Sequence, residues 1–387
     1  MAKPIDSRVG IVGGGQLGKM LIESAQKWNI RFNVLDSPGA PAEKYAEVFI
    51  SGSLTDVEHI RQLAEVSDIL TYEIEHINAD ELLRLQIEGK KIVPSPEVLL
   101  TIQDKGIQKN FYTQNKLPTA PFVLINADAI DSEIAKLSQL RGDKLVVKSC
   151  RGGYDGKGVV IVNRDSITSA EIGKLFSGQI LIEECITNAI ELSVIVARDE
   201  NGQTATYPVV EMVFDPVKNL VDHLFAPARI SKSVEETAVS ISLAAVEAMN
   251  GVGIFAVELF MDEDENLLIN EIAPRPHNSG HHTIEACYTS QYEQLTRILL
   301  GFPLGSTQLL KPAVMTNIIG PSDVNGDYKL NGVDELMRIP GAYLHWYNKK
   351  ETRPGRKMGH FTILNDSLDK ALKLSKEVAQ SLQIVAV

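Results

Sequence analysis

The stretch Gly253 to His282, GIFAVELFMDEDENLLINEIAPRPHNSGHH, decides how the rest of the chain is arranged. Two apolar runs, 254–261 and 267–272, flank an acidic turn, which predicts a β-hairpin. Glu258 and Glu271 lie at equal distances from the centre of that turn. In an antiparallel pair they would face each other roughly 5 Å apart, where two carboxylates repel unless a cation or a proton neutralises them. Mg²⁺ suits this arrangement because it prefers oxygen ligands.

The alternative is a surface hairpin whose two glutamates point into solvent. The sequence beyond Glu271 favours the metal site instead. Residues 273–281, APRPHNSGH, place an arginine, two imidazoles and two short polar side chains directly after the second carboxylate. We therefore expect the hairpin to carry a cation site.

The composition bounds the class of protein. The chain has 387 residues, enough for two or three domains, and its net charge of −12 argues against a nucleic-acid partner. Cys150, Cys185 and Cys287 are too far apart in the sequence for a disulfide framework or a zinc pattern, which favours a reducing cytoplasm. No apolar stretch approaches a membrane span, and the N-terminus lacks a signal-peptide layout, so we expect no membrane partner.

The N-terminal segment predicts a small parallel sheet over residues 1–98. A strand at 9–12 leads into GGGQLG and a helix, and Asp36 ends the next strand, as in dinucleotide-binding folds. Amides at a helix N-terminus hold any phosphate or carboxylate, so we expect an anion site there. We do not expect a nicotinamide site, because no second nucleotide-binding half follows. Glu73, after the fourth strand, either meets a polar substrate or is a helix N-terminal acid.

A glycine-rich hairpin loop lies at 151–158, RGGYDGKG, between predicted strands at 144–148 and 159–162. Four glycines in seven residues leave the loop amides able to close over phosphates. The loop is not a P-loop, because β-branched residues rather than a helix follow it. A purely structural hairpin is the alternative, but Lys148 at the strand end is placed to reach a phosphate oxygen.

The remaining elements are predicted from the periodicity of apolar residues and from the turn-forming residues between them. We expect helices at 97–115, 235–249 and 368–382, a buried strand at 180–186, a strand at 192–198, and short strands at 313–319, 343–347 and 360–364. The run 349–357 has five cations in nine residues. Such runs are often solvated loops. Here a Pro-Gly turn between Arg353 and Arg356 indicates a fixed guanidinium pair suited to a phosphate monoester.

These motifs together resemble the ATP-grasp enzymes: the strand-terminal lysine, GGYDGKG, ILIEECI, VELF and INEIAPRPHNSGHHT. More narrowly, the chain resembles the 5-(carboxyamino)imidazole ribonucleotide synthetase family over nearly its whole length. GGGQLGKM, YEIEHIN, LHWY and RPGRKMGH add to the likeness, and APRPHNSGH with RPGRKMGH is its most specific part. The resemblance implies a chain of mixed α/β and α+β class. It also implies an ATP-grasp fold at 99–300, with a lid at about 119–187. A parallel α/β domain at 1–98 precedes it and a small mostly-β domain at 301–387 follows.

The resemblance also implies an activity, a homodimer and site residues. ATP and bicarbonate, with Mg²⁺ as cofactor, would carboxylate aminoimidazole ribonucleotide through carboxyphosphate, in purine biosynthesis. Implied catalytic residues are Arg275, His277 and Lys148, and implied metal ligands are Glu258 and Glu271. Implied ATP ligands are Lys105, Lys148, Gly153, Tyr154, Asp155, Gly156, Lys157, Gly158, Val159, Glu183, Glu184, Cys185, Ile186, Glu191, Asn270 and Glu271. Implied substrate ligands are Gln16, Leu17, Glu73, Tyr154, Asp155, Asn278, Ser279, Lys349, Arg356 and Lys357.

Three other functions were weighed against this one. A formate-dependent glycinamide ribonucleotide transformylase shares the fold, but the glycine loop and HNSGH favour the carboxylating enzyme. A nicotinamide-dependent oxidoreductase would rest on the first glycine loop alone. A non-catalytic nucleotide sensor would not need two facing glutamates together with Arg275. Lys349 and Lys350 compete for one substrate position, and the spacing to Arg356 favours Lys349.

Overall fold

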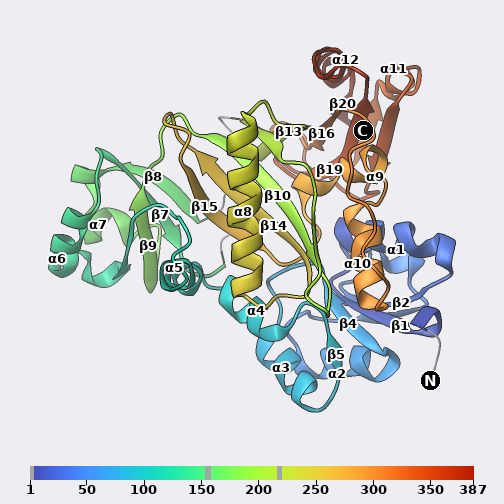
Figure 1. The fold of residues 1–387 in the computed structure, drawn as a ribbon, viewed down its shortest axis with the longest axis horizontal. Coiled ribbons are helices and arrows are strands. Elements are labelled where there is room, and N and C mark those ends of the chain that lie inside the picture. Colours follow the sequence, from blue (N-terminus) through green and yellow to red (C-terminus); the bar gives the residue numbers. More distant parts are fainter. Residues whose placement is uncertain (1–3, 153–157, 216–219) are drawn as a thin grey trace.

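The computed structural model describes residues 4–152, 158–215 and 220–387, and their strands form four sheets. Figure 1 shows the N-terminal elements, the C-terminal elements and a smaller unit with β7, β8 and β9 at separate corners around a central sheet. No helix in the described part of the chain has both the length and the apolar character required to cross a bilayer.

The N-terminal sheet is parallel, as the sequence predicts, with the order β3-β2-β1-β4-β5. Alternation of apolar strands with amphipathic helices produces it, because each helix buries one face on the sheet. β3 is a short edge strand of this sheet, and no bounds are predicted for it from the sequence. The bounds are β1 Arg8–Val12, α1 Gln16–Ala25, β2 Arg31–Asp36, β3 Val48–Ser51, α2 Val57–Val66, β4 Ile69–Tyr72, α3 Ala79–Ile87 and β5 Lys91–Ile92.

The small antiparallel sheet has the order β6-β9-β7-β8. Its own core includes Leu145, Val147, Ile180 and Ile182. The predicted hairpin is confirmed, since β7 and β8 pair from Lys144 with Asn163 through Lys148 with Val159. The elements are β6 Phe122–Asn126, α6 Ile130–Glu133, β7 Lys144–Ser149, β8 Val159–Asn163, α7 Ser169–Ile172 and β9 Gln179–Glu184.

The central sheet has nine strands, with β11 attached to β10 beside the path β15-β14-β10-β12-β13-β16-β19-β18. Helix α8 lies across it in Figure 1 and buries Ala238 and Ala245 in a core with Val194, Phe255 and Val257. The bounds are β10 Ile190–Arg198, β11 Thr204–Thr206, β12 Val210–Asp215, β13 Leu220–Ala226, α8 Lys232–Ala248, β14 Gly253–Met261, β15 Leu267–Ala273, α9 Thr283–Ala286 and α10 Gln291–Leu299.

The C-terminal strands extend this same sheet. β16 pairs with β13 along four residues, from His223 with Thr316 to Ala226 with Ala313. A short two-stranded sheet, β17 with β20, lies outside it. The bounds are β16 Ala313–Ile319, β17 Tyr328–Asn331, α11 Val333–Met337, β18 Ala342–Trp346, β19 Lys357–Leu364, α12 Leu368–Ser381 and β20 Gln383–Ala386.

The single helix expected at 97–115 is wrong, because two helices occupy the segment: α4 Pro96–Ile102 and α5 Lys105–Gln114. Asp104 separates them. Its carboxylate accepts from the backbone N–H groups of Gly106 and Ile107 and so caps the start of α5. The break re-aims the second helix toward the small sheet, where the Lys105 N–H donates to the Cys150 carbonyl at 2.8 Å.

Candidate active site

The hairpin register predicted from the sequence is confirmed. β14 and β15 pair antiparallel, and Glu258 lies opposite Glu271. Closer to the turn, Leu259 pairs with Ile269, so one extra residue, Asn270, is accommodated by a bulge. A bulge turns a side chain away from its regular alternation. The Asn270 amide oxygen accepts a hydrogen bond from Lys148 Nζ at 3.0 Å, which joins the hairpin to the small sheet.

The two facing carboxylates have different surroundings. Lys105 Nζ lies 2.6 Å from Glu271 Oε2, and this ammonium holds the pKa of Glu271 below its ordinary value. Glu258 is more deeply placed, with 12% of its side chain exposed and His277 Nε2 at 3.6 Å. Burial, and then the charge of Glu271, raise the pKa of Glu258. The conflict expected between the two charges is therefore relieved on one side by a lysine and on the other by a raised pKa.

The donor set fits Mg²⁺. Glu258 and Glu271 offer carboxylate oxygens from adjacent strands, and Mg²⁺ typically takes one or two carboxylates and completes its shell with water and substrate phosphates. Within residues 4–152, 158–215 and 220–387, no group of three or more His, Cys, Asp or Glu side chains is arranged to hold a metal by itself. A Mg²⁺ site on these two glutamates would therefore be completed by water or by a phosphate-bearing ligand.

Lys148 lies at the end of β7 and is buried. Its ammonium lies 2.5 Å from Glu183 Oε1. The other oxygen of that carboxylate lies 2.6 Å from Lys109 Nζ on α5. Although burial opposes ionisation, Lys148 and Lys109 lower the pKa of Glu183 to about 2. The sequence analysis assigned Lys109 no role, although Lys105 and Lys109 lie four residues apart and hence on one helix face.

The other described residues expected around ATP lie in β8, β9 and β10 or next to them. Glu191 lies in β10, and burial raises its pKa to about 7. Glu184 accepts from the Arg141 backbone N–H at 2.6 Å, and the Gly158 carbonyl accepts from Ser149 at 2.9 Å. Cys185 and Ile186 follow β9, and Val159 begins β8. The predicted ligands Gly153, Tyr154, Asp155, Gly156 and Lys157 lie outside the described residues.

The segment after β15 brings Arg275 and His277 to the same end of the hairpin. Arg275 Nε lies 2.9 Å from Glu75 Oε1, which ties this segment to the loop after β4. The His277 imidazole Nδ1 lies 2.9 Å from the Ser279 hydroxyl, and that buried hydroxyl also pairs with Ser193 at 2.9 Å. Ser279, expected to touch substrate, thus uses its side chain to orient His277.

Asn278 is held by a reciprocal amide pair with Asn317 of β16. Asn278 Nδ2 donates to Asn317 Oδ1 at 2.9 Å, and Asn317 Nδ2 donates back at 3.0 Å. Asn317 also donates to the Val221 carbonyl at 2.8 Å. Asn317 belongs to the C-terminal strands, so the sequence alone could not connect it with Asn278, which follows the hairpin.

The first glycine turn is occupied by a carboxylate of the protein itself. Glu73 accepts from the backbone N–H groups of Gly15 and Gly18, at the start of α1, which begins with Gln16 and Leu17. In this structure Glu73 is an acid at the N-terminus of α1, and its contact with substrate stays a prediction. The expected anion site exists, but its anion is Glu73. Burial raises the pKa of Glu73 to about 7.

This raised pKa predicts how stability changes with pH. Between the unfolded pKa of about 4.3 and the folded pKa of about 7, the folded protein keeps a proton that the unfolded chain has lost. Stability from this group is present below that window and is lost as pH rises through it. We expect wild type to lose stability relative to Glu73→Gln between pH 5 and pH 8, as measured by urea unfolding. Parallel curves for the two proteins would contradict the shift.

The C-terminal cations form a partly fixed group beside α1. Lys349 Nζ donates to the Lys357 carbonyl at 2.7 Å, and Arg356 Nη1 donates to the Glu351 carbonyl at 2.6 Å. The predicted turn is present, since the Arg356 N–H donates to the Arg353 carbonyl at 3.0 Å. Lys19 of α1 donates to the Trp346 carbonyl at 2.6 Å, so α1 of the N-terminal part contacts β18 of the C-terminal part here.

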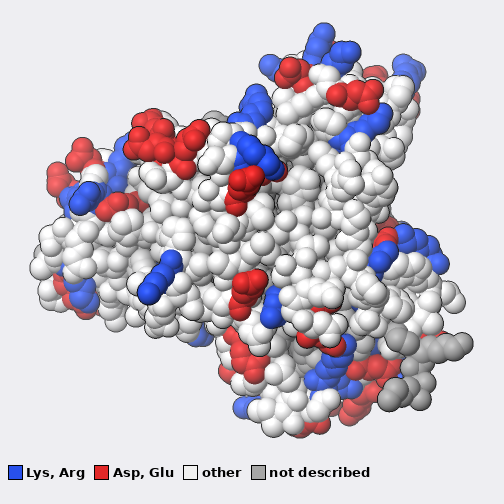
Figure 2. Space-filling model, in the orientation of Figure 1, with Lys and Arg blue, Asp and Glu red and all other residues white. Residues whose placement is uncertain are grey.

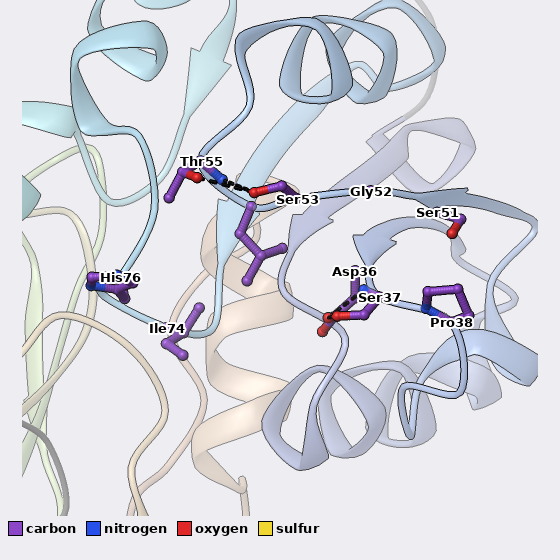
Figure 3. Close-up of a pocket in the computed structure, with 10 residues that line it drawn as sticks. Asp36, Ser37, Pro38, Ser51, Gly52, Ser53, Thr55, Ile74 and His76 are labelled. Carbon is purple, nitrogen blue, oxygen red and sulfur yellow. Dashed lines mark hydrogen bonds between the residues drawn. The ribbon is translucent and has the colours of Figure 1, made fainter.

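A hollow of about 550 Å³ lies at the carboxyl ends of β2, β3 and β4, and Figure 3 shows its lining. The lining residues are Asp36, Ser37, Pro38, Ser51, Gly52, Ser53, Leu54, Thr55, Ile74 and His76. It includes Asp36, which accepts from the Gly14 N–H at 2.6 Å, but none of the lysines or glutamates of the hairpin region. We therefore place the candidate site by its charged groups, not by this hollow.

Comparisons with known families cover almost the whole chain. Residues 7–103 match the ribonucleotide synthetase preATP-grasp domain, 110–292 match the ATP-grasp domain, and 313–374 match the phosphoribosylaminoimidazole carboxylase C-terminal domain. Fold and site together define an ATP-dependent ligase of the ATP-grasp class.

Curated relatives narrow this class. The N5-carboxyaminoimidazole ribonucleotide synthase of Bacillus subtilis is 38% identical over 93% of this chain and 92% of its own length. The phosphoribosylaminoimidazole carboxylase of Schizosaccharomyces pombe is 40% identical over 93% of this chain, which spans 65% of that longer protein. The chain belongs to the N5-carboxyaminoimidazole ribonucleotide synthase family.

Solved structures agree with this assignment. The N5-carboxyaminoimidazole ribonucleotide synthetase of Thermotoga maritima superposes with a TM-score of 0.88 at 41% identity, covering 98% of this chain and 100% of that one. The Aspergillus clavatus enzyme in complex with ADP and 5-aminoimidazole ribonucleotide has a TM-score of 0.87 at 33% identity, covering 97% and 98%.

Proposed function

We propose that the protein carboxylates 5-aminoimidazole ribonucleotide to 5-(carboxyamino)imidazole ribonucleotide, using ATP and bicarbonate, in purine biosynthesis. The supporting observation is the pair Glu258 and Glu271 on adjacent strands, with Lys105 and Lys148 beside it. The same-fold alternative, a glycinamide ribonucleotide transformylase, is disfavoured because relatives matching more than nine tenths of the chain are named for carboxylation.

The chemistry divides into two transfers. A bicarbonate oxygen attacks the γ-phosphorus of ATP, ADP leaves, and carboxyphosphate forms. The exocyclic amine of the ribonucleotide then attacks the carbonyl carbon, phosphate leaves, and the amine loses a proton. The chain's own part is positioning and charge neutralisation, which is how phosphoryl transfer is generally catalysed.

Each charged group has a place in this scheme. Lys105 and Lys148 would neutralise ATP phosphates, and Arg275 with His277 would hold bicarbonate and carboxyphosphate at the end of β15. Glu258 and Glu271 would hold Mg²⁺, which when bound offsets negative charge on phosphate oxygens. Carboxyphosphate hydrolyses readily, so the site would have to exclude water while it forms.

The activity can be tested directly. We expect ADP release to require both aminoimidazole ribonucleotide and bicarbonate. ADP release with glycinamide ribonucleotide and formate, and none with the first pair, would overturn the proposal. Stoichiometric formation of the carboxylated amine, followed with labelled bicarbonate, would exclude simple ATP hydrolysis.

Arg356 provides a prediction about the ribonucleotide. We propose that this half-buried guanidinium, fixed by the turn at Arg353 and by the Glu351 carbonyl, binds the ribonucleotide phosphate. Arg356→Ala should weaken that binding by roughly 1.5 to 3 kcal/mol, seen as a raised KM for the ribonucleotide with little change in the KM for ATP. Arg338→Ala, in another part of the C-terminal region, is the matched control. An unchanged KM for the ribonucleotide would remove Arg356 from the site.

Three further assignments belong to the proposal. We propose a homodimer on the family likeness, and a cytoplasmic location on the three separate cysteines, which are free in the structure. We also propose the division into 1–98, 99–300 with a lid at about 119–187, and 301–387. The family matches end and begin close to these boundaries, at 103, 110, 292 and 313.

A further inference from the structure

We propose that Lys109 is a positioning residue of the ATP site, which acts through Glu183 to keep the positive charge of Lys148 available to the nucleotide phosphates. The inference rests on the proposed function only in requiring that ATP phosphates bind at Lys148. Binding of ATP phosphates at Lys148 does not by itself require Lys109 or the side chain of Glu183. The contact between these three side chains therefore needs an explanation of its own.

The geometry is that of one carboxylate shared by two ammonium groups. Glu183 Oε2 lies 2.6 Å from Lys109 Nζ, and Glu183 Oε1 lies 2.5 Å from Lys148 Nζ. The side chains of Lys109 and Glu183 are each 3% exposed, and that of Lys148 is 10% exposed. The three charges therefore interact in a poorly hydrated space, where each is felt strongly by its neighbours.

The net charge of the triad formed by Lys109, Glu183 and Lys148 explains the effect that we propose for Lys109. Glu183 with Lys148 alone would be a neutral pair, with little attraction left for a phosphate. Lys109 brings the triad to one net positive charge, and Lys148 is the member that also reaches the hairpin, through Asn270 Oδ1 at 3.0 Å. The carboxylate thus fixes where Lys148 points, and Lys109 restores the charge that this contact would cancel.

Lys109 is also hydrogen-bonded, through Thr119, to the hairpin of β14 and β15. Its ammonium donates to Thr119 Oγ1 at 2.6 Å, and that hydroxyl donates to the Ile269 carbonyl at 2.8 Å. Ile269 is the neighbour of the bulged Asn270. The two lysines therefore reach adjacent residues of β15: Lys148 contacts Asn270 directly, and Lys109 reaches Ile269 through Thr119.

The test uses the full chain and a double substitution. Lys109→Met should lower the affinity for ADP, measured by calorimetry, and raise the KM for ATP by about tenfold or more, with the KM for the ribonucleotide changed less than threefold. Lys109→Met combined with Glu183→Gln removes the opposing charges together. We expect it to restore ADP affinity to within a few-fold of wild type, because Lys148 then faces a neutral amide.

The outcomes are separable. Lys174→Met, which removes an exposed lysine paired with Glu171, is the matched control and should behave as wild type. If Lys109→Met leaves the KM for ATP unchanged, or if the double variant is no better than the single one, Lys109 has only a structural role and the proposal fails. A wild-type protein that binds no ADP would instead refute the proposed function. Thermal unfolding of each variant identifies loss of fold.

Discussion

Replacing Glu271 with glutamine is expected to reduce Mg²⁺-dependent turnover by roughly a hundredfold or more, because the Mg²⁺ that this carboxylate would hold offsets phosphate charge and stabilises the transition state by several kcal/mol. The substitution keeps the shape of the side chain but removes its charge opposite Glu258. It also leaves Lys105, which lies 2.6 Å from Glu271, without its carboxylate partner. Initial rates measured against Mg²⁺ concentration report both the lost turnover and the weakened metal dependence.

Glu263→Gln is the matched control for this substitution. Glu263 lies in the turn of the same hairpin and is exposed, with its carboxylate 2.8 Å from the Asn188 amide. We expect its rate and Mg²⁺ dependence to match wild type. A near-normal kcat for Glu271→Gln would remove this residue from the proposed metal site. The two facing carboxylates could then no longer be explained by metal binding.

Replacing Arg275 with methionine is expected to lower kcat/KM for bicarbonate by about two orders of magnitude, as loss of a preorganised charge at the transferring group typically does. The Glu75 carboxylate at 2.9 Å from Arg275 Nε orients the guanidinium, so its position does not depend on substrate. Methionine keeps much of the length without the charge. The measurement is ADP release as a function of bicarbonate concentration.

The control for Arg275 is Arg297→Met, which removes a guanidinium that pairs with Glu293 on α10 at 2.9 Å. It should leave the bicarbonate dependence unchanged. ADP binding to Arg275→Met should stay within a few-fold of wild type, since Lys105 and Lys148 are intact. A variant that loses ADP affinity and bicarbonate dependence equally would show that Arg275 supports the nucleotide and not the carboxyl group.

The sequence predicts that Glu258 faces Glu271 from symmetry about a turn centred between residues 264 and 265. The strands next to the turn instead pair about residue 264, and the bulge at Asn270 restores the predicted partner. Nothing in the sequence of the hairpin signals the bulge at Asn270. The outer edge of β15 also contacts a segment distant in sequence, since the Ile269 N–H donates to the Pro118 carbonyl at 2.8 Å. The direction of Asn270 toward Lys148 follows from the bulge, which interrupts the regular alternation of the strand. A turn pattern contains no such information.

Other differences have similar causes. The helix break at Asp104 carried a local signal, an N-capping aspartate, which the long amphipathic pattern around it obscured. Glu73 left two alternatives open because both place a carboxylate at the same strand end, and only the structure shows it bonded to Gly15 and Gly18. Nothing local in β16 identifies β13 as its neighbour, so the extent of the central sheet was beyond the sequence.

The pairing of β13 with β16 has a consequence for how this chain can be divided. The proposed boundary near residue 301 falls between two family matches, which end at 292 and begin at 313, yet the backbone hydrogen bonds of one sheet cross it. Cutting there would leave β13 with a bare edge beside the buried Leu224 and Phe225, which is a template for aggregation. The C-terminal segment therefore cannot be exchanged between relatives by itself. Chimaeric proteins should exchange it together with the strands of the central sheet that it pairs with.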